Sequence, residues 1–191
     1  MEREDADKWD ARYREREDLE TEPIPFLVDQ SGRLASGKAL VLAAGCGRNA
    51  VYLAERGFAV TALDISEVGL ECCRKLADQR GVEVETICAD LDNHDLGIDR
   101  YDLITMIYFN EPTLFPAIRR ALNPGGTFFF HTFGQRHAEV GTFGPRNPAY
   151  LASQDTLRDA FSTDDIVICE EAVLTDEEDT ESVLQAIIRI K

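Results

Sequence analysis

The chain has little of what marks membrane, secreted or nucleic-acid-binding proteins. Its apolar runs fall well short of the ~20 residues that a membrane-spanning helix needs. The first twenty residues are dense in charges of both signs and contain no apolar stretch typical of a secretory signal. Only 20 basic residues face 36 acidic ones, and the net charge of −16 disfavours nucleic acid, whose affinity depends on neutralised phosphates. These absences predict a cytoplasmic protein that binds neither membrane nor nucleic acid.

Cysteine and histidine are also scarce and unfavourably spaced for a metal. The five cysteines form no CxxC pair, and the three histidines have no zinc spacing, so no metal site is expected. Cys88 and Cys169 fall in apolar strand patterns and are expected to be small core residues. Adjacent Cys72 and Cys73 point about 100° apart on a helix, so a joint role in binding thiophilic metalloids is the less favoured alternative.

The 191 residues suffice for one domain, and strand-like and helix-like segments alternate along them. Because parallel strands need right-handed crossovers over the sheet faces, the alternation predicts a doubly wound α/β fold with helices on both faces. Ser66 and Gly81 are expected to cap the second of these helices. Strands are expected at 38–44, 58–64, 82–90, 101–109 and 127–133, helices at 47–56, 66–80, 112–123 and 153–161, and a final hairpin at 165–174 and 182–191.

Small and acidic residues follow the first two expected strands. Gly45 and Gly47 allow a ligand to approach the backbone, and the next helix offers free N–H groups at its amino terminus. Asp64 ends the second strand, at the position where doubly wound folds bind ribose hydroxyls. A nucleoside-containing ligand is therefore expected. A nicotinamide-dependent reductase is the less favoured alternative, because the third glycine and a Tyr-x-x-x-Lys pair are missing.

Five motifs in order carry a resemblance to a known family: residues 43–50 (Ala-Ala-Gly-Cys-Gly-Arg-Asn-Ala), Asp64, Ala89-Asp90, 101–104 (Tyr-Asp-Leu-Ile) and 122–126 (Leu-Asn-Pro-Gly-Gly). Together they resemble the class I S-adenosylmethionine-dependent methyltransferases. Within that class, 47–57 and the opening Lys8-Trp9-Asp10-x-Arg12-Tyr13 are similar to the small tellurite-resistance and thiopurine type. The resemblance implies a mostly parallel seven-stranded sheet of order 3-2-1-4-5-7-6 with the last strand antiparallel. It also implies one methyltransferase domain over 1–191, with a helical cap or lid at 1–36 and a cofactor-binding core at 37–191.

The resemblance assigns roles to particular residues. Gly45 and Gly47 would line the methionine end of S-adenosylmethionine, and Asp64 would hold its ribose hydroxyls. Asp90 would bind the adenine amino group between Ile65 and Leu91. The remaining cofactor-binding candidates are Arg48 and Asn49. Purely structural roles are the alternative: a tight turn at the glycines, a helix cap at Asp64 and a turn at Asp90.

One position departs from the family. Its members usually carry an acid two residues before the first glycine of the motif, where this chain has Val41, and Ala43 replaces that glycine. An apolar side chain cannot attract the cofactor's ammonium group as a carboxylate does, so a weaker site is expected. A non-catalytic S-adenosylmethionine-binding protein is therefore a second alternative.

The methyl acceptor is expected at the ends of the fourth and fifth strands and in the 134–152 connection, a long segment in which no secondary structure is expected. Tyr108, His131 and Arg146 are the catalytic candidates, with His131 as a base for an acceptor proton or simply bonded to the backbone. Arg146 is expected to orient an anionic, planar small molecule, or else to pair with surface carboxylates. His137 is expected at the solvated surface. Further candidates are Asn110 and Arg136.

The amino-terminal helix carries an aromatic pair. Trp9 and Tyr13 are one helical turn apart and share a face. Anchoring of the helix to the core is the favoured interpretation, and a lid over the cofactor is the alternative. A monomer or weak homodimer is expected.

Overall fold

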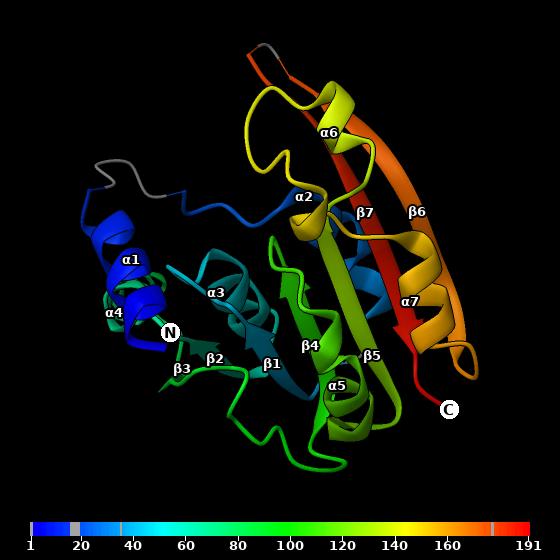
Figure 1. Ribbon diagram of the computed structural model, residues 1–191. Helices are drawn as coiled ribbons and strands as arrows, with labels where there is room; N and C mark the ends of the chain where they lie inside the picture. Colours follow the sequence, from blue (N-terminus) through cyan, green and yellow to red (C-terminus); the bar gives the residue numbers. More distant parts are fainter. Residues whose placement is uncertain (1, 16–19, 35, 177) are drawn as a thin grey trace.

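The computed structural model describes residues 2–15, 20–34, 36–176 and 178–191, and a single seven-stranded sheet runs through it (Figure 1). The strands are β1 (Lys38–Leu42), β2 (Ala59–Asp64), β3 (Val84–Cys88), β4 (Tyr101–Ile107), β5 (Leu122–Phe133), β6 (Asp165–Thr175) and β7 (Thr180–Arg189).

The strand order is β3-β2-β1-β4-β5-β7-β6, as the sequence predicts. The contacts among β1 to β5 are parallel, whereas β7 runs antiparallel to both β5 and β6. The antiparallel contacts arise because β6 and β7 form a hairpin, and a short turn can join antiparallel strands but not parallel ones. The predicted fold class is confirmed.

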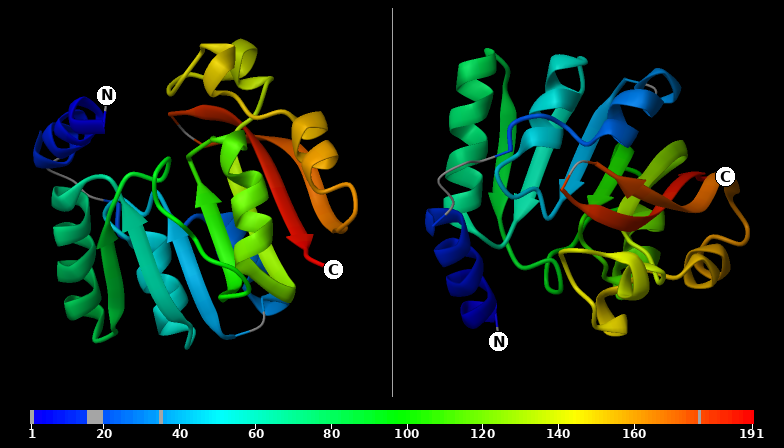
Figure 2. Two further views of the ribbon diagram at one scale, coloured as in Figure 1. Left: turned by 60° about the horizontal axis from the view of Figure 1, so that its bottom comes forward. Right: turned by 90° about the horizontal axis from the view of Figure 1, so that it is seen from above.

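Helices cover both faces of the sheet (Figure 2). On one face, α5 and α7 pack Ile118 and Leu157 against an aromatic layer from β5. On the other face, α3 and α4 bury Leu53 and Leu70. The described helices are α1 (Glu2–Glu15), α2 (Pro25–Gln30), α3 (Arg48–Glu55), α4 (Glu67–Arg80), α5 (Phe115–Ala121), α6 (His137–Val140) and α7 (Gln154–Ala160), with single 3-10 turns at Ser31–Arg33, Pro112–Leu114 and Pro148–Tyr150. None of these described helices is long and apolar enough to cross a membrane.

Both predicted caps of α4 are present. The Ser66 hydroxyl accepts a hydrogen bond from the Gly69 N–H, which satisfies one of the free donors of the first turn. Gly81 ends the helix in the left-handed conformation at φ 69°, which costs a residue without a side chain little. Residues next to α4 in the sequence thus determine where this helix begins, directly after β2, and where it ends.

The structure differs from the sequence-based expectation in three places. The 134–152 connection is not irregular throughout, because it contains α6 and the 3-10 turn at Pro148–Tyr150. His137 is not at the surface but fully buried, since it lies between the connection and β7. Cys88 is exposed because β3 is the edge strand, and Cys169 is only half-buried.

Val41 lies in the apolar core rather than at an open edge. Its exposed fraction is 3%, and it packs in the cluster between the sheet and the α2 and α3 side. Its neighbours across the sheet are Ala62 on β2 and Thr105 on β4. The Thr105 hydroxyl could offer a carboxylate at this position only a single hydrogen bond.

We expect Val41→Asp to lower the free energy of unfolding by about 3–5 kcal/mol, because it places an uncompensated charge in the core. Urea denaturation measures the change. The matched control is Val173→Asp at an exposed position of β6, which we expect to alter stability by no more than about 0.5 kcal/mol. A stable Val41→Asp variant with tighter cofactor binding would instead support the family's usual acid at this position.

Candidate functional site

The loop between β1 and α3 turns sharply at the carboxyl edge of the sheet. Three of its residues have left-handed backbones: Ala43 at φ 51°, Gly45 at φ 53° and Gly47 at φ 81°. A Cβ at Gly45 would meet the hydroxyl end of the Tyr13 side chain, and one at Gly47 would collide with the Cys73 side chain. Conformation therefore favours glycine at both positions, and close packing requires it at Gly47.

Asp64 joins this loop to the next crossover. Its carboxylate accepts hydrogen bonds from the Gly45 N–H at 2.7 Å and from the Ser66 N–H at 2.8 Å. Burial raises the pKa of Asp64, and the two backbone donors oppose that rise by stabilising the charged form. Asp64 thus has the structural role that the sequence offers as an alternative, because it stabilises the turn before α4. Its carboxylate also lies at the carboxyl edge of the sheet, where the cofactor is expected.

Helix α1 lies against the start of α4 and the glycine loop (Figures 1 and 2). Asp10 accepts hydrogen bonds from the Ser66 hydroxyl at 2.6 Å and from the Val68 N–H at 3.3 Å. Tyr13 packs on Gly45, whereas Trp9 is 36% exposed. The favoured anchoring role therefore fails for Trp9, whereas Tyr13 does hold α1 against Gly45 and the start of α4.

Arg48 and Asn49 open α3 beside the loop. Arg48 forms an ion pair with Glu20, and its guanidinium lies 5.9 Å from the centre of the Tyr108 ring. Asn49 accepts a hydrogen bond from the Ile24 N–H at 3.0 Å. Both side chains thereby connect the segment before α2 to the carboxyl edge.

The candidate adenine-binding residues follow β2 and β3. Asp90 accepts a hydrogen bond from the Asp92 N–H at 3.0 Å, so it also shapes a turn, as the structural alternative predicts. Ile65 is half-buried, and Leu91 is buried in the core at 8% exposure. The three residues share the edge with Asp64, since β2 and β3 are parallel neighbours.

Tyr108 follows β4 with a left-handed backbone at φ 51°. A non-glycine residue in this region is strained, and such strain concentrates at functional sites. Its hydroxyl donates to the Glu181 carboxylate, with oxygen separations of 2.9 and 3.0 Å. Burial and the neighbouring Glu181 charge both raise the pKa of Tyr108, so the phenol stays protonated.

His131 on β5 lies beside Tyr108, with ring centres 5.2 Å apart in an edge-on arrangement. Its Nδ1 faces the Gln185 Nε2 at 3.4 Å, and its buried Nε2 has no hydrogen-bond partner among the described residues. Because an amide nitrogen only donates, this contact assigns the imidazole proton to Nε2. Burial, aided by the Arg48 charge, lowers the pKa of His131 to about 4. The ring is thus a neutral hydrogen-bond donor, a poorer general base than the sequence suggests.

The structure does not bring Arg146 into this cluster through any contact of the described residues. Its guanidinium donates to the Gly141 carbonyl at 2.8 Å, within its own connection. His137 holds the same connection to β7, since its Nδ1 accepts from the Ser182 N–H while its Nε2 donates to the Phe143 carbonyl. Arg136 is likewise held by its backbone, whose N–H donates to Glu171.

Sequence reasoning missed three residues of this edge. Glu181 and Gln185 reach it from β7, where the register places Gln185 opposite His131. No motif marks them, because antiparallel pairing with a distant strand sets their position. Asp10 was visible in the opening motif, but its contact with α4 was not.

The cysteine pair is split by packing. Cys73 is fully buried beneath Gly47, and burial raises its thiol pKa to about 11, whereas Cys72 is only half-buried. A thiol that keeps its proton is a poor metal or metalloid ligand.

Comparison with known proteins agrees with this geometry. Residues 39–126 match the family described as methyltransferase domain. The ubiquinone biosynthesis O-methyltransferase of Salmonella arizonae is 29% identical over 118 residues, which cover 59% of this chain and 49% of that protein. The chain thus spans about half the length of the curated relatives it matches.

Solved structures share the fold. TehB from Haemophilus influenzae superposes with a TM-score of 0.75 at 18% identity, over 97% of this chain and 67% of that one. The 1,6-didemethyltoxoflavin-N1-methyltransferase of Burkholderia thailandensis, solved with 1,6-didemethyltoxoflavin and S-adenosylhomocysteine, gives a TM-score of 0.63 at 20% identity over 86% of this chain and 75% of that one.

Residues 39–126, just under half of the chain, are thus similar to a methyltransferase domain, and the sheet order and the solved structures confirm the fold that the resemblance implies. In overall fold the chain is similar to TehB.

We expect NMR titration to find His131 neutral down to about pH 4, because its buried ring disfavours the charge. Its pKa is lower in the folded than in the unfolded chain, so the unfolded chain binds the proton first as pH falls below about 6.5. Stability should therefore decrease from there toward pH 4, and His131→Asn should weaken this dependence. An ordinary pKa near 6.5 would contradict the burial argument.

Proposed function

We propose that this protein transfers a methyl group from S-adenosylmethionine to a small-molecule acceptor. The observation that carries the proposal is the juxtaposition of the glycine loop and the buried Asp64 carboxylate at one edge, next to the Tyr108 and His131 cluster. The methyltransferase domain match and the shared fold support it.

The residues at this edge fit the cofactor. Gly45 and Gly47 form the buried turn before α3, and Asp64 keeps lone pairs free beside its two backbone donors. Asp90 with Ile65 and Leu91 would hold the adenine end, and Arg48 and Asn49 would close the other side. S-adenosylmethionine would supply a methyl group bonded to a sulfonium. The methyl group passes to the acceptor, and the electron pair of the broken C–S bond returns to the sulfur.

The chain's own contribution is alignment and exclusion of water. His131 donates from Nε2 to a lone pair of the acceptor, and Tyr108, fixed by Glu181, provides an aromatic wall. Arg146, on the adjoining connection, orients an anionic acceptor once it leaves the Gly141 carbonyl. Helix α1 acts as a lid through Tyr13, so residues 1–36 form the cap and 37–191 the core of one domain.

The finer assignments belong to the same proposal. The enzyme would act in the cytoplasm as a monomer or weak homodimer, in class EC 2.1.1, without nucleic-acid or membrane partners. The charge of −16 supports the exclusion of nucleic acid.

A non-catalytic S-adenosylmethionine-binding protein is the second candidate, favoured by Val41 in place of the acid. The two differ in turnover. Saturable cofactor binding without methyl transfer to any acceptor would select the binding protein.

We expect S-adenosylhomocysteine at ~100 times its dissociation constant to stabilise the protein by about 2.7 kcal/mol, measured as a thermal shift, with NADH giving none.

The Asp64→Asn variant should weaken the binding of S-adenosylhomocysteine by about 1.5–3 kcal/mol, because a charged hydrogen-bond acceptor is lost. Ser66→Ala is the matched control, since it alters the same turn but leaves the carboxylate. Equal losses in both variants would assign Asp64 a purely structural role.

For the acceptor we expect turnover with one class in a panel of thiols, phenols, carboxylates and tellurite, and none with small RNAs. His131→Asn and Arg146→Ala should each lower kcat/KM by about tenfold or more, equivalent to ~1.4 kcal/mol of lost stabilisation. Arg158→Ala, an exposed arginine of α7, is the control. Full activity of the Arg146 variant would remove that residue from the acceptor site.

A further inference from the structure

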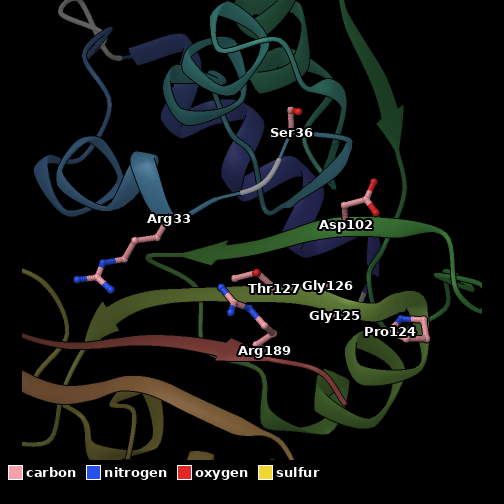
Figure 3. Close-up of a pocket in the computed structure, with 8 residues that line it drawn as sticks. All are labelled: Arg33, Ser36, Asp102, Pro124, Gly125, Gly126, Thr127 and Arg189. Atoms are coloured by element: carbon pink, nitrogen blue, oxygen red, sulfur yellow. The ribbon is translucent and has the colours of Figure 1, made fainter.

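A cavity of about 250 Å³ opens at the edge of the sheet opposite the candidate site (Figure 3). Its walls come from the segment before β1, the starts of β4 and β5, and the end of β7. Asp102 lines it from the second position of β4, whereas Tyr108 follows the end of the same strand. At ~3.3 Å per residue, about 20 Å separate the cavity from the proposed acceptor site.

Two arginines line this cavity from different elements. Arg33 ends the 3-10 turn Ser31–Arg33, and Arg189 ends β7 opposite Thr127 on β5. Within the part of the chain that the structure describes, neither guanidinium has an ion pair, hydrogen bond or ring contact. In a chain with 36 acidic and 20 basic residues, two arginines without carboxylate partners at one cavity are unexpected. Their donors are available to a ligand.

Asp102 lies on the other side of the lining from the two arginines (Figure 3). It is held in place by the Lys38 N–H and the Asn123 side-chain amide, both at 2.8 Å. These two donors lower the pKa of Asp102, so the carboxylate remains charged. Each oxygen retains a free lone pair beside its one donor. The cavity thus has a cationic and an anionic side.

We propose that this cavity binds a small molecule that carries a phosphate monoester at one end and an ammonium group at the other. Two planar guanidinium forks match the oxygens and double charge of a phosphate, whereas a carboxylate would neutralise only one. The Ser36 hydroxyl lines the cavity as a further donor, and Asp102 pairs with the ammonium. The volume lies below the ~300 Å³ at which drug-sized sites begin, which restricts the ligand to a few heavy atoms beyond the phosphate.

Isothermal titration calorimetry tests the proposal with three probes: O-phosphoethanolamine, propyl phosphate and inorganic phosphate. All three should bind, with O-phosphoethanolamine at least roughly tenfold tighter than propyl phosphate, because only it offers an ammonium to Asp102. Equal affinity for these two would overturn the role of Asp102. Absence of saturable binding of any probe at millimolar concentration would overturn the site.

Variants separate the site from general electrostatics. Arg33→Gln and Arg189→Gln should each weaken O-phosphoethanolamine binding by roughly tenfold or more, because each loses a charged fork. Both side chains are exposed, so unchanged melting temperatures without ligand are expected. Lys8→Gln removes the same charge from exposed α1 and should leave affinity within about twofold. Equal weakening in all three variants, or none in the arginine variants, would contradict the proposal.

Discussion

The carboxylate of Asp64 is the contact on which the carboxyl edge depends. By accepting from the N–H groups of Gly45 and Ser66, it ties the loop after β1 to the turn before α4. Backbone donors at two separate turns would otherwise lie in a partly buried region without partners, at a cost of about 1–3 kcal/mol each. One side chain thus fixes the relative position of two crossovers and presents its charge at the edge.

Two non-glycine residues with positive φ values lie at the same edge. Ala43 is on the glycine loop after β1, and Tyr108 follows β4, the neighbouring strand; the third such residue among those described, Asp99, precedes β4. Such conformations persist only where surrounding contacts over-determine them. Here the contacts are the Asp64 bridge for the loop and the Glu181 hydrogen bond for Tyr108. The strained backbone and its supports belong to one functional region.

The final hairpin also contributes side chains to the candidate acceptor site. β7 lies between β5 and the edge strand β6, and its side chains Glu181 and Gln185 contact Tyr108 and His131. A buried imidazole with an unsatisfied Nε2 is costly, and the cost is consistent with a ligand atom as the missing partner. The opposite edge carries a different chemistry, because Arg33, Arg189 and the fixed Asp102 carboxylate line one cavity there.

The sequence by itself determined the fold class, the strand order implied by its motifs, the caps of α4 and the glycine loop followed by Asp64. These features are local: alternation of strand and helix patterns, cap chemistry and turn glycines act over a few residues, and the strand order came from a resemblance. Tertiary structure alone decided that His137 is buried, that Arg146 bonds within its own connection and that Glu181 supports Tyr108. It also decided that Val41 is a core residue and that Arg33 and Arg189 line one cavity. These outcomes depend on the register of β7 and the packing of distant segments, which are set by the summed burial of the whole core and leave no signal in any short stretch of sequence.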